Sequence, residues 1–140
     1  MDEEPKRPKV GIGVLIQKNG KFLLGKRVSQ HAPGVFSPPG GHLEYNETIT
    51  EAGIRETREE AGIEIHNVRF LCVCNERAYG KHYLNVGLLA DWKSGEPQIM
   101  EKDKFASWDW YELDQFPEPG FALNTLYIEA VKTGKNFFDN

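Results

Sequence analysis

The sequence predicts an α+β fold in which two helices pack on a mixed β-sheet. Three observations indicate this class: the chain has 140 residues, several segments have strand-like patterning, and two segments far apart have helical punctuation or periodicity. A chain of this length suits a single domain and can bury a core. No repeat, low-complexity tract or interdomain linker divides it, so we expect one domain over residues 1–140.

The N-terminal part predicts an arm followed by a β-hairpin. Residues 1–8 place two prolines among charges, which is typical of a flexible arm. Residues 10–16 are nearly all apolar or glycine, as in a buried strand. Residues 22–27 follow the Asn19-Gly20 turn signal and form the predicted second strand. Turn-forming residues then dominate from 31 to 41.

A first helix is predicted between two capping signals. Thr48 and Glu51 have the spacing of a capping box, in which each residue bonds the backbone of the other. Gly62 stands where a left-handed C-terminal cap belongs.

The C-terminal part predicts three strands and a second helix. We expect strands at residues 68–74, 82–92 and 105–111, the last of them short and aromatic. A helix is expected from about residue 121 to 132. Its apolar residues recur at helical spacing and form a core-facing stripe: Leu123, Leu126, Tyr127, Ala130 and Val131.

Composition excludes several classes of protein. The net charge of −4 argues against a broad surface for nucleic-acid phosphates, but leaves room for a local basic site facing a small anion. No apolar run reaches transmembrane length, and the N-terminal residues lack the apolar region of a signal peptide. Cys72 and Cys74 have no second pair to complete a zinc site. We expect a cytoplasmic protein with reduced cysteines and with neither a nucleic acid polymer nor a membrane as partner.

The first predicted helix carries three glutamates, Glu56, Glu59 and Glu60. At about 100° per residue, Glu56 and Glu60 fall within about 20° of Ile49, on the stripe that faces the protein, and Glu59 lies close by. A solvated acidic helix would place its glutamates on the opposite face. Inward carboxylates at this density need a cation or raised pKa values, and their oxygens suit Mg²⁺ or Mn²⁺ rather than zinc.

Arg55 directly precedes this cluster and follows Glu51 by four residues. That spacing allows a helical ion pair with Glu51, which on a surface contributes little to stability. The alternative is a clamp that orients metal-binding carboxylates.

The residues around the cluster match a longer pattern. Gly41, five residues, Glu47, seven residues and then RETREEAGI, from residue 55 to 63, resembles the Nudix box, GX5EX7REUXEEXGU, where U is a bulky apolar residue. Every Gly, Glu and Arg of the motif is present, and Thr57 stands at an apolar position. The resemblance implies the Nudix α/β/α sandwich and hydrolysis of a nucleoside diphosphate linked to another group.

The resemblance also implies roles for the residues of the box. Glu56 and Glu60 would be the principal metal ligands, Glu59 a further ligand or an aid to water activation, and Gly41 a carbonyl ligand. Arg55 would hold Glu56 in place. Glu47 has two readings, a metal contact or a charge that stabilises the helix N-terminus.

Residues outside the box have weaker assignments. Arg27 resembles the phosphate-binding arginine of the family, with a solvated strand-end cation as the equal alternative. His42 could donate to a phosphate. Asp103 is our candidate for a further acidic residue from a loop, with Glu101 as the other candidate; either could be a solvated loop charge.

Further segments resemble the MutT-like nucleoside triphosphate pyrophosphohydrolases, which are often small dimers. The resemblance implies a Mg²⁺-dependent enzyme that converts a nucleoside triphosphate, including oxidised guanine or cytosine nucleotides, to the monophosphate and pyrophosphate. Phe121 would stack on the base, although Ala122 stands where a tryptophan is expected. One alternative is another diphosphate: ADP-ribose, a dinucleotide or an isoprenoid diphosphate. The other is a non-catalytic nucleotide-binding module. A homodimer is also implied.

Overall fold

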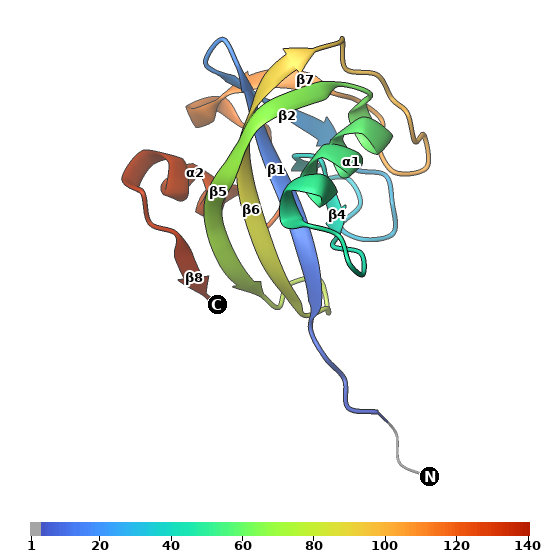
Figure 1. The fold of residues 1–140 in the computed structure, drawn as a ribbon, viewed down its shortest axis with the longest axis vertical. Coiled ribbons are helices and arrows are strands. Elements are labelled where there is room, and N and C mark those ends of the chain that lie inside the picture. Colours follow the sequence, from blue (N-terminus) through green and yellow to red (C-terminus); the bar gives the residue numbers. More distant parts are fainter. Residues whose placement is uncertain (1–3) are drawn as a thin grey trace.

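A mixed sheet organises the protein, whose computed structural model describes residues 4–140 (Figure 1). The main path of strands runs β3-β2-β1-β6-β5-β8, with β4 paired to β1 and β7 paired to β2. β1 pairs in parallel with β6 and β5 in parallel with β8, and the other strand pairs are antiparallel. The strands are β1 (Lys9–Lys18), β2 (Lys21–Lys26), β3 (Phe36–Ser37), β4 (Gly40–His42), β5 (Glu64–Glu76), β6 (Tyr83–Ser94), β7 (Asp109–Glu112) and β8 (Phe137–Asp139).

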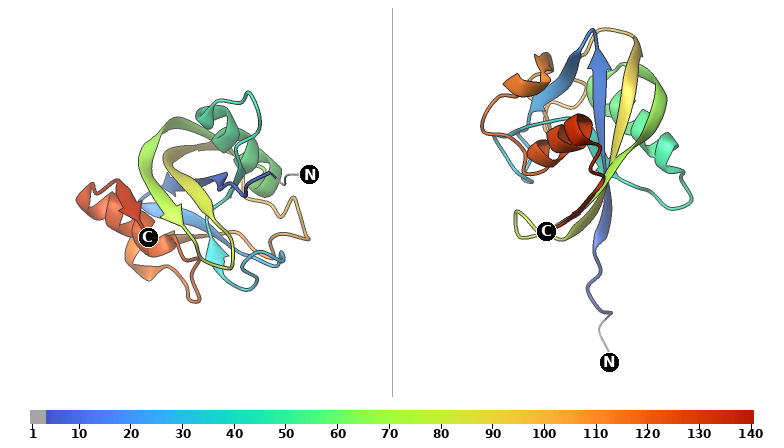
Figure 2. Two further views of the ribbon diagram at one scale, coloured as in Figure 1. Left: turned by 90° about the horizontal axis from the view of Figure 1, so that it is seen from below. Right: turned by 90° about the vertical axis from the view of Figure 1, so that its left-hand side faces the viewer.

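Two α-helices cover opposite faces of this sheet (Figures 1 and 2). Helix α1 (Ile49–Ala61) packs on the face to which β1 contributes Ile12, Val14 and Ile16. Helix α2 (Asn124–Thr133) packs on the face to which β1 contributes Leu15. The predicted α/β/α sandwich is therefore confirmed.

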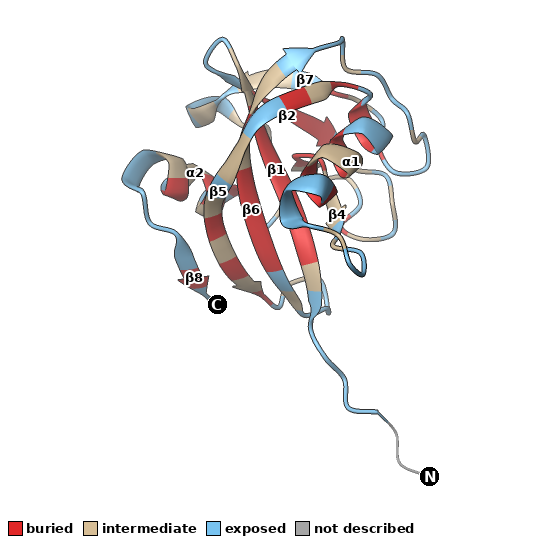
Figure 3. Cartoon of the chain, in the orientation of Figure 1, coloured by how far each residue is buried: buried red, intermediate tan, exposed pale blue. Residues whose placement is uncertain are grey.

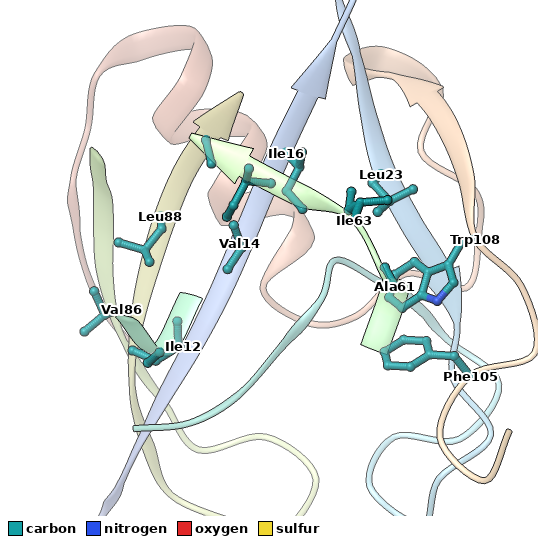
Figure 4. Close-up of a cluster of buried hydrophobic side chains, with 13 residues drawn as sticks. Ile12, Val14, Ile16, Leu23, Ala61, Ile63, Val86, Leu88, Phe105 and Trp108 are labelled. Carbon is teal, nitrogen blue, oxygen red and sulfur yellow. The ribbon is translucent and has the colours of Figure 1, made fainter. Parts of the chain in front are cut away.

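Strand alternation explains why β1 is buried throughout its centre. Successive side chains of a strand point to opposite faces, and both faces here are covered by helices. Figure 3 shows the resulting run of buried residues along β1 and β6. Figure 4 shows the core on the α1 side, where Val14 and Leu88 lie on neighbouring strands and Phe105 and Trp108 close the far end.

The predicted limits of α1 are confirmed. The Thr48 hydroxyl accepts a hydrogen bond from the Glu51 N–H at 3.0 Å, and the Glu51 carboxylate accepts one from the Thr48 N–H at 3.0 Å. Gly62 has φ 68°, the left-handed conformation that glycine adopts without strain. The departure at Thr57 is accommodated, because its buried hydroxyl donates to the Gly53 carbonyl at 2.8 Å.

The second helix begins later than predicted, at Asn124 rather than near residue 121. The Phe121 N–H donates to the Phe36 carbonyl at 2.9 Å, which ties this residue to β3 before the helix starts. The predicted apolar stripe does face the core: Leu123, Tyr127 and Ala130 are buried, and Leu126 and Val131 pack against them.

Several strand limits differ from the predictions because strand pairing extends or shortens them. β5 begins at Glu64 and β7 at Asp109, whereas Phe105 makes only an isolated bridge with Arg27. β3, β4 and β8 were not predicted, since each of these short segments is a strand only through a distant partner. Of the predicted arm, residues 4–8 are exposed and irregular, and residues 1–3 lie outside the described part.

The cysteines and helices agree with two further expectations. Cys72 and Cys74 are buried and not disulfide-bonded, with their sulfur atoms 3.8 Å apart. Within residues 4–140, neither helix is long and apolar enough to cross a bilayer.

Candidate active site

A cleft of about 430 Å³ lies where the loop after β2, strand β4, helix α1 and the sheet meet. One end is lined by residues of the predicted box, including Gly41, Glu56 and Glu60. The other end is lined by residues from the sheet and its loops, including Glu76 and Phe121. We call these the helix end and the sheet end of the cleft.

Helix α1 presents two buried carboxylates to the helix end. Glu56 and Glu60 are 7% and 4% exposed, and Ala52 and Gly53 on the same stripe are also buried. Ile49, which begins the stripe, is 40% exposed. Glu59 is exposed but lines the same end of the cleft. The predicted inward orientation of Glu56 and Glu60 is therefore confirmed.

The two glycines of β4 bring the backbone against these carboxylates. A Cβ atom on Gly41 would collide with the Glu56 carboxylate in the position where Arg55 holds it. The Gly40 N–H donates to Glu60 Oε1 at 2.8 Å. β4 holds this position because it pairs with β1, with Gly41 opposite Ile12.

Burial makes the paired carboxylates costly to ionise. Burial raises the pKa of Glu60 to about 8; the charge of Glu56 acts in the same direction, and the Gly40 hydrogen bond opposes it. Burial also raises the pKa of Glu56, against the opposing hydrogen bond and charge of Arg55. Two such groups are best satisfied by a cation placed between them.

Arg55 organises the helix end as the expected clamp on Glu56, and not through the alternative pair with Glu51. Its Nε and second terminal nitrogen contact the two oxygens of Glu47, at 2.7 and 3.0 Å. Its first terminal nitrogen donates to Glu56 Oε1 at 2.8 Å and approaches Glu59 at 3.3 Å. Glu51 is engaged in the capping box instead. Glu47 therefore anchors Arg55. The hydrogen bonds that Arg55 donates to Glu47 and Glu56 raise the pKa of Arg55.

The donor set at the helix end fits a hard divalent cation. Glu56, Glu59 and Glu60 supply carboxylate oxygens from one helix, and the backbone of Gly41 lies against Glu56. Across residues 4–140, no three acidic, histidine or cysteine side chains are already gathered as a complete ion site. Glu56 is turned toward Arg55 and Glu60 toward Gly40, which accounts for their separation.

Arg27 lies between the two ends of the cleft. It donates to the His31 carbonyl at 3.0 Å, to Ser29 Oγ at 3.2 Å and to Ser37 Oγ at 3.3 Å. These bonds engage three of its five N–H groups. Burial lowers the pKa of Arg27, and the charge of Glu60 is the largest influence opposing it. Arg27 is thus held in the cleft with two N–H groups that these bonds do not engage.

Only some of the other predicted site residues line the cleft. His42 lines the cleft, stacks on Tyr83 with ring centroids 5.5 Å apart, and bonds the Tyr83 hydroxyl at 2.9 Å. Asp103 is exposed and does not line the cleft. The alternative, Glu101, is half-buried and its charge contributes to the raised pKa of Glu60, so it lies nearer the site.

Phe121 reaches the cleft from the turn before α2, and Tyr79 stacks on it. Their ring centroids are 5.6 Å apart with an interplanar angle of 18°. The Ala122 N–H donates to the Tyr79 hydroxyl at 2.9 Å. Tyr79, from the loop between β5 and β6, therefore supports the Phe121 ring but does not itself line the cleft.

Sequence reasoning did not identify three cleft residues at the sheet end: His31, Tyr83 and Glu76. His31 lies against the rings of Tyr79 and Phe121, which nothing in the sequence indicated. A signal for Glu76 was present. Cys72, Cys74 and Glu76 alternate along one strand, which places the carboxylate on the buried face.

Comparison with known proteins finds a matching family model and several relatives. Residues 5–130 match the family model described as NUDIX domain. The chain is 36% identical over 106 residues to an NAD-capped RNA hydrolase NudC of Photorhabdus laumondii, which covers 76% of this chain and 40% of that protein. It is 29% identical to an ADP-ribose pyrophosphatase of Methanocaldococcus jannaschii, over 89% of this chain and 74% of that protein. The chain thus spans less than half of the NudC relative.

A solved structure agrees with this assignment. The crystal structure of a MutT NUDIX hydrolase from Burkholderia pseudomallei superimposes with a TM-score of 0.84 at 34% identity. The likeness covers 90% of this chain and 99% of that one. Together with the family match and the intact box on α1, these likenesses show that the chain belongs to the Nudix hydrolase family.

Proposed function

We propose that this chain, as a single Nudix domain, hydrolyses the pyrophosphate bond of a nucleoside diphosphate linked to a second group. We infer a substrate of the ADP-ribose or dinucleotide type. The observation that carries the reaction class is the buried pair Glu56 and Glu60, brought against Gly40 and Gly41 and faced by Arg27. The substrate type is supported by relatives named for NAD-capped RNA and ADP-ribose.

The expectation of a nucleoside triphosphate is less well supported than this alternative. Its main support is the solved relative titled a MutT hydrolase. We therefore retain triphosphate hydrolysis as the second candidate.

The residues of the helix end have different roles: metal binding, orientation of a metal ligand, and acceptance of a proton. Glu56, Glu60 and the Gly41 carbonyl would hold Mg²⁺, or Mn²⁺ in its place, with Glu59 as a further oxygen donor. When bound, such an ion supplies charge neutralisation at the phosphates and an acidified water. Arg55 fixes the rotamer of Glu56 through a 2.8 Å hydrogen bond. Glu59 is exposed to the cleft and accepts the proton of the attacking water, a role we assign to it rather than to Asp103.

Substrate is held from the sheet side. Arg27 has unengaged N–H groups for a phosphate oxygen. His42 lines the same cleft and adds a further donor. Phe121, supported by the stacked Tyr79 ring, presents an aromatic surface to the nucleoside part of the substrate.

A substrate panel with Mg²⁺ tests the proposal. ADP-ribose, NADH, dGTP, 8-oxo-dGTP, dCTP and geranyl diphosphate are assayed in parallel, with Glu56→Gln as the inactive control. We expect kcat/KM to be at least about tenfold higher for ADP-ribose or NADH than for any triphosphate, a difference of about 1.4 kcal/mol in transition-state binding. Preference for a triphosphate would favour the second candidate, and tight binding without product would indicate a non-catalytic module. Light scattering of the same sample tests the expected homodimer.

A further inference from the structure

The sheet end of the cleft contains a buried carboxylate without a partner. Glu76, the last residue of β5, is 5% exposed, and its Oε1 atom is buried with no hydrogen-bond donor. Within residues 4–140, no ion pair or hydrogen bond to its side chain is present. A buried acceptor left unsatisfied carries a large desolvation cost, so this group is suited to a donor that comes from outside the chain.

The register of the sheet explains why Glu76 faces the cleft. Cys74 lies opposite Asn85 and Glu76 opposite Tyr83, on the face that packs against α2. Asn85 in turn lies opposite Gly11 of β1, and Gly11, Asn85 and Glu76 all line the cleft. The carboxylate therefore stands at the end of a buried row that reaches the cleft.

Glu76 shares the cleft with the carboxylates of α1 but comes from another element. Glu56 and Glu60 line the cleft from α1, Glu76 lines it from the end of β5, and Arg27 lines it as well. The charges of Glu60 and Glu76 both act on the Arg27 guanidinium, Glu60 more strongly. A substrate with its diphosphate at the helix end and Arg27 has its nucleoside part near Glu76.

We propose that Glu76 determines specificity by accepting hydrogen bonds from two adjacent donors on the nucleoside part of the substrate. A carboxylate offers two acceptor oxygens and no donor when ionised, so it repels phosphate and selects paired O–H or N–H groups. Two parts of a nucleotide supply such a pair: the cis-diol of a ribose, and the N1–H and 2-amino edge of guanine. The inference rests on the proposed function, since it assumes that the diphosphate lies at the helix end.

Glu76→Gln tests this assignment, because it keeps the size of the side chain but replaces one acceptor with a donor. Binding of AMP, 2′-deoxy-AMP, GMP and IMP to the full chain is measured by titration calorimetry for wild type and variant. The matched control is Glu129→Gln, which changes an exposed carboxylate on α2. Thermal unfolding verifies that each variant is folded, and Glu76→Ala provides a second variant.

Two results support the proposal and identify the source of the donors. If Glu76→Gln lowers the affinity for AMP by about tenfold or more, and that for 2′-deoxy-AMP by less than about twofold, Glu76 is assigned to the ribose diol. The same loss for GMP, with little for IMP, assigns it to the guanine edge. Equal loss for all four ligands, no loss, or no binding by the wild type would overturn it. These titrations do not require turnover, so a wild type that shows selective binding but hydrolyses nothing would contradict only the proposed function.

Discussion

The two ends of the cleft differ in how completely the protein satisfies its own polar groups. At the helix end, Glu56 is bonded by Arg55, Glu60 by the Gly40 N–H, and Arg55 by Glu47. Among the described residues that line the cleft, Glu76 Oε1 and His31 Nδ1, both at the sheet end, are buried without partners; Glu101 Oε1 and Asn124 Oδ1 are as well, but these residues do not line the cleft. The helix end is thus preorganised, whereas the sheet end has unsatisfied groups that a substrate can reach.

This difference separates the reaction from the choice of substrate. Positioning of charged groups before substrate arrives is a main source of catalytic rate, and it requires the dense hydrogen bonding found around Arg55. Recognition instead gains from groups that remain unpaired until the right ligand binds. Substitutions at the helix end should therefore lower kcat for every substrate, and those at the sheet end should change KM and substrate ranking.

The largest effect is expected at Glu56 and Glu60. Glu56→Gln or Glu60→Gln should lower kcat/KM by about 10³-fold or more, since each removes a charged oxygen donor from the proposed metal site. Thermal stability should be kept or increased, because the raised pKa of each buried carboxyl lowers the stability of the folded state at neutral pH. Steady-state kinetics with Mg²⁺ and thermal unfolding measure the two quantities. Unchanged turnover in either variant would contradict the proposed mechanism.

A smaller effect is expected when Arg55 is replaced by lysine. Arg55→Lys keeps the charge but cannot contact Glu47 with two nitrogens while also bonding Glu56. We expect kcat to fall by about 10–100-fold, the usual cost of losing a group that orients a ligand, with KM changed little. Arg58→Lys is the matched control on the same helix, because Arg58 contacts only the exposed Glu64. Equal losses in both variants would show that helix stability, not orientation, is affected.

The sheet end is expected to show a change in KM rather than in kcat. Tyr79→Ala removes the ring stacked on Phe121 and the acceptor for the Ala122 N–H. Loss of one stacking surface corresponds to about 1–3 kcal/mol, so KM should rise by about tenfold for substrates with a base. Tyr45→Ala, at a fully exposed tyrosine, is the control. A fall in kcat with constant KM would place Tyr79 in the chemistry and remove the distinction between the two ends.

The smallest effect is a pH dependence of stability that arises at His31. Burial lowers the pKa of His31 to about 4, and the charges of Lys81, Arg27 and His42 act in the same direction. The unfolded chain, with a pKa near 6.5 at this position, therefore binds the proton more readily. The stabilisation is complete above about pH 6.5 and is lost as the pH falls toward 4. We expect about 1 kcal/mol between pH 7 and pH 4.5, after allowance for solvent screening.

Denaturant unfolding of wild type and His31→Gln at both pH values measures this contribution. The variant should lose less stability between pH 7 and pH 4.5 than the wild type does. An identical loss in both proteins would exclude His31 as its source.

The sequence predictions were accurate where they depended on residues only a few positions apart. The capping box of Thr48 and Glu51 and the cap at Gly62 determine the ends of α1, because each needs only neighbours within four residues. The burial of Glu56 and Glu60 follows from helical periodicity on the same element. Such local patterns could also have predicted Glu76, through its alternation with Cys72 and Cys74.

Predictions that depended on distant partners were less accurate. For Arg55, the neighbouring residues of the helix alone left two readings open, and its bonds with Glu47 and Glu56 favour the clamp over the pair with Glu51. The late start of α2 follows from the bond between Phe121 and Phe36, 85 positions apart in the numbering. Asp103, the predicted acidic residue from a loop, lies exposed and outside the cleft.

By itself, the sequence determined the α+β class, the limits of α1, the inward carboxylate pair and the family, since these follow from short-range patterns along one element. Only the tertiary structure decided what faces those carboxylates. Gly41 meets Glu56 because β4 pairs with β1, Tyr79 meets Phe121 across two loops, and Glu76 reaches the cleft without a partner for its Oε1 atom. The physical reason is that contacts between distant segments exist only once the sheet has set its strand order and register.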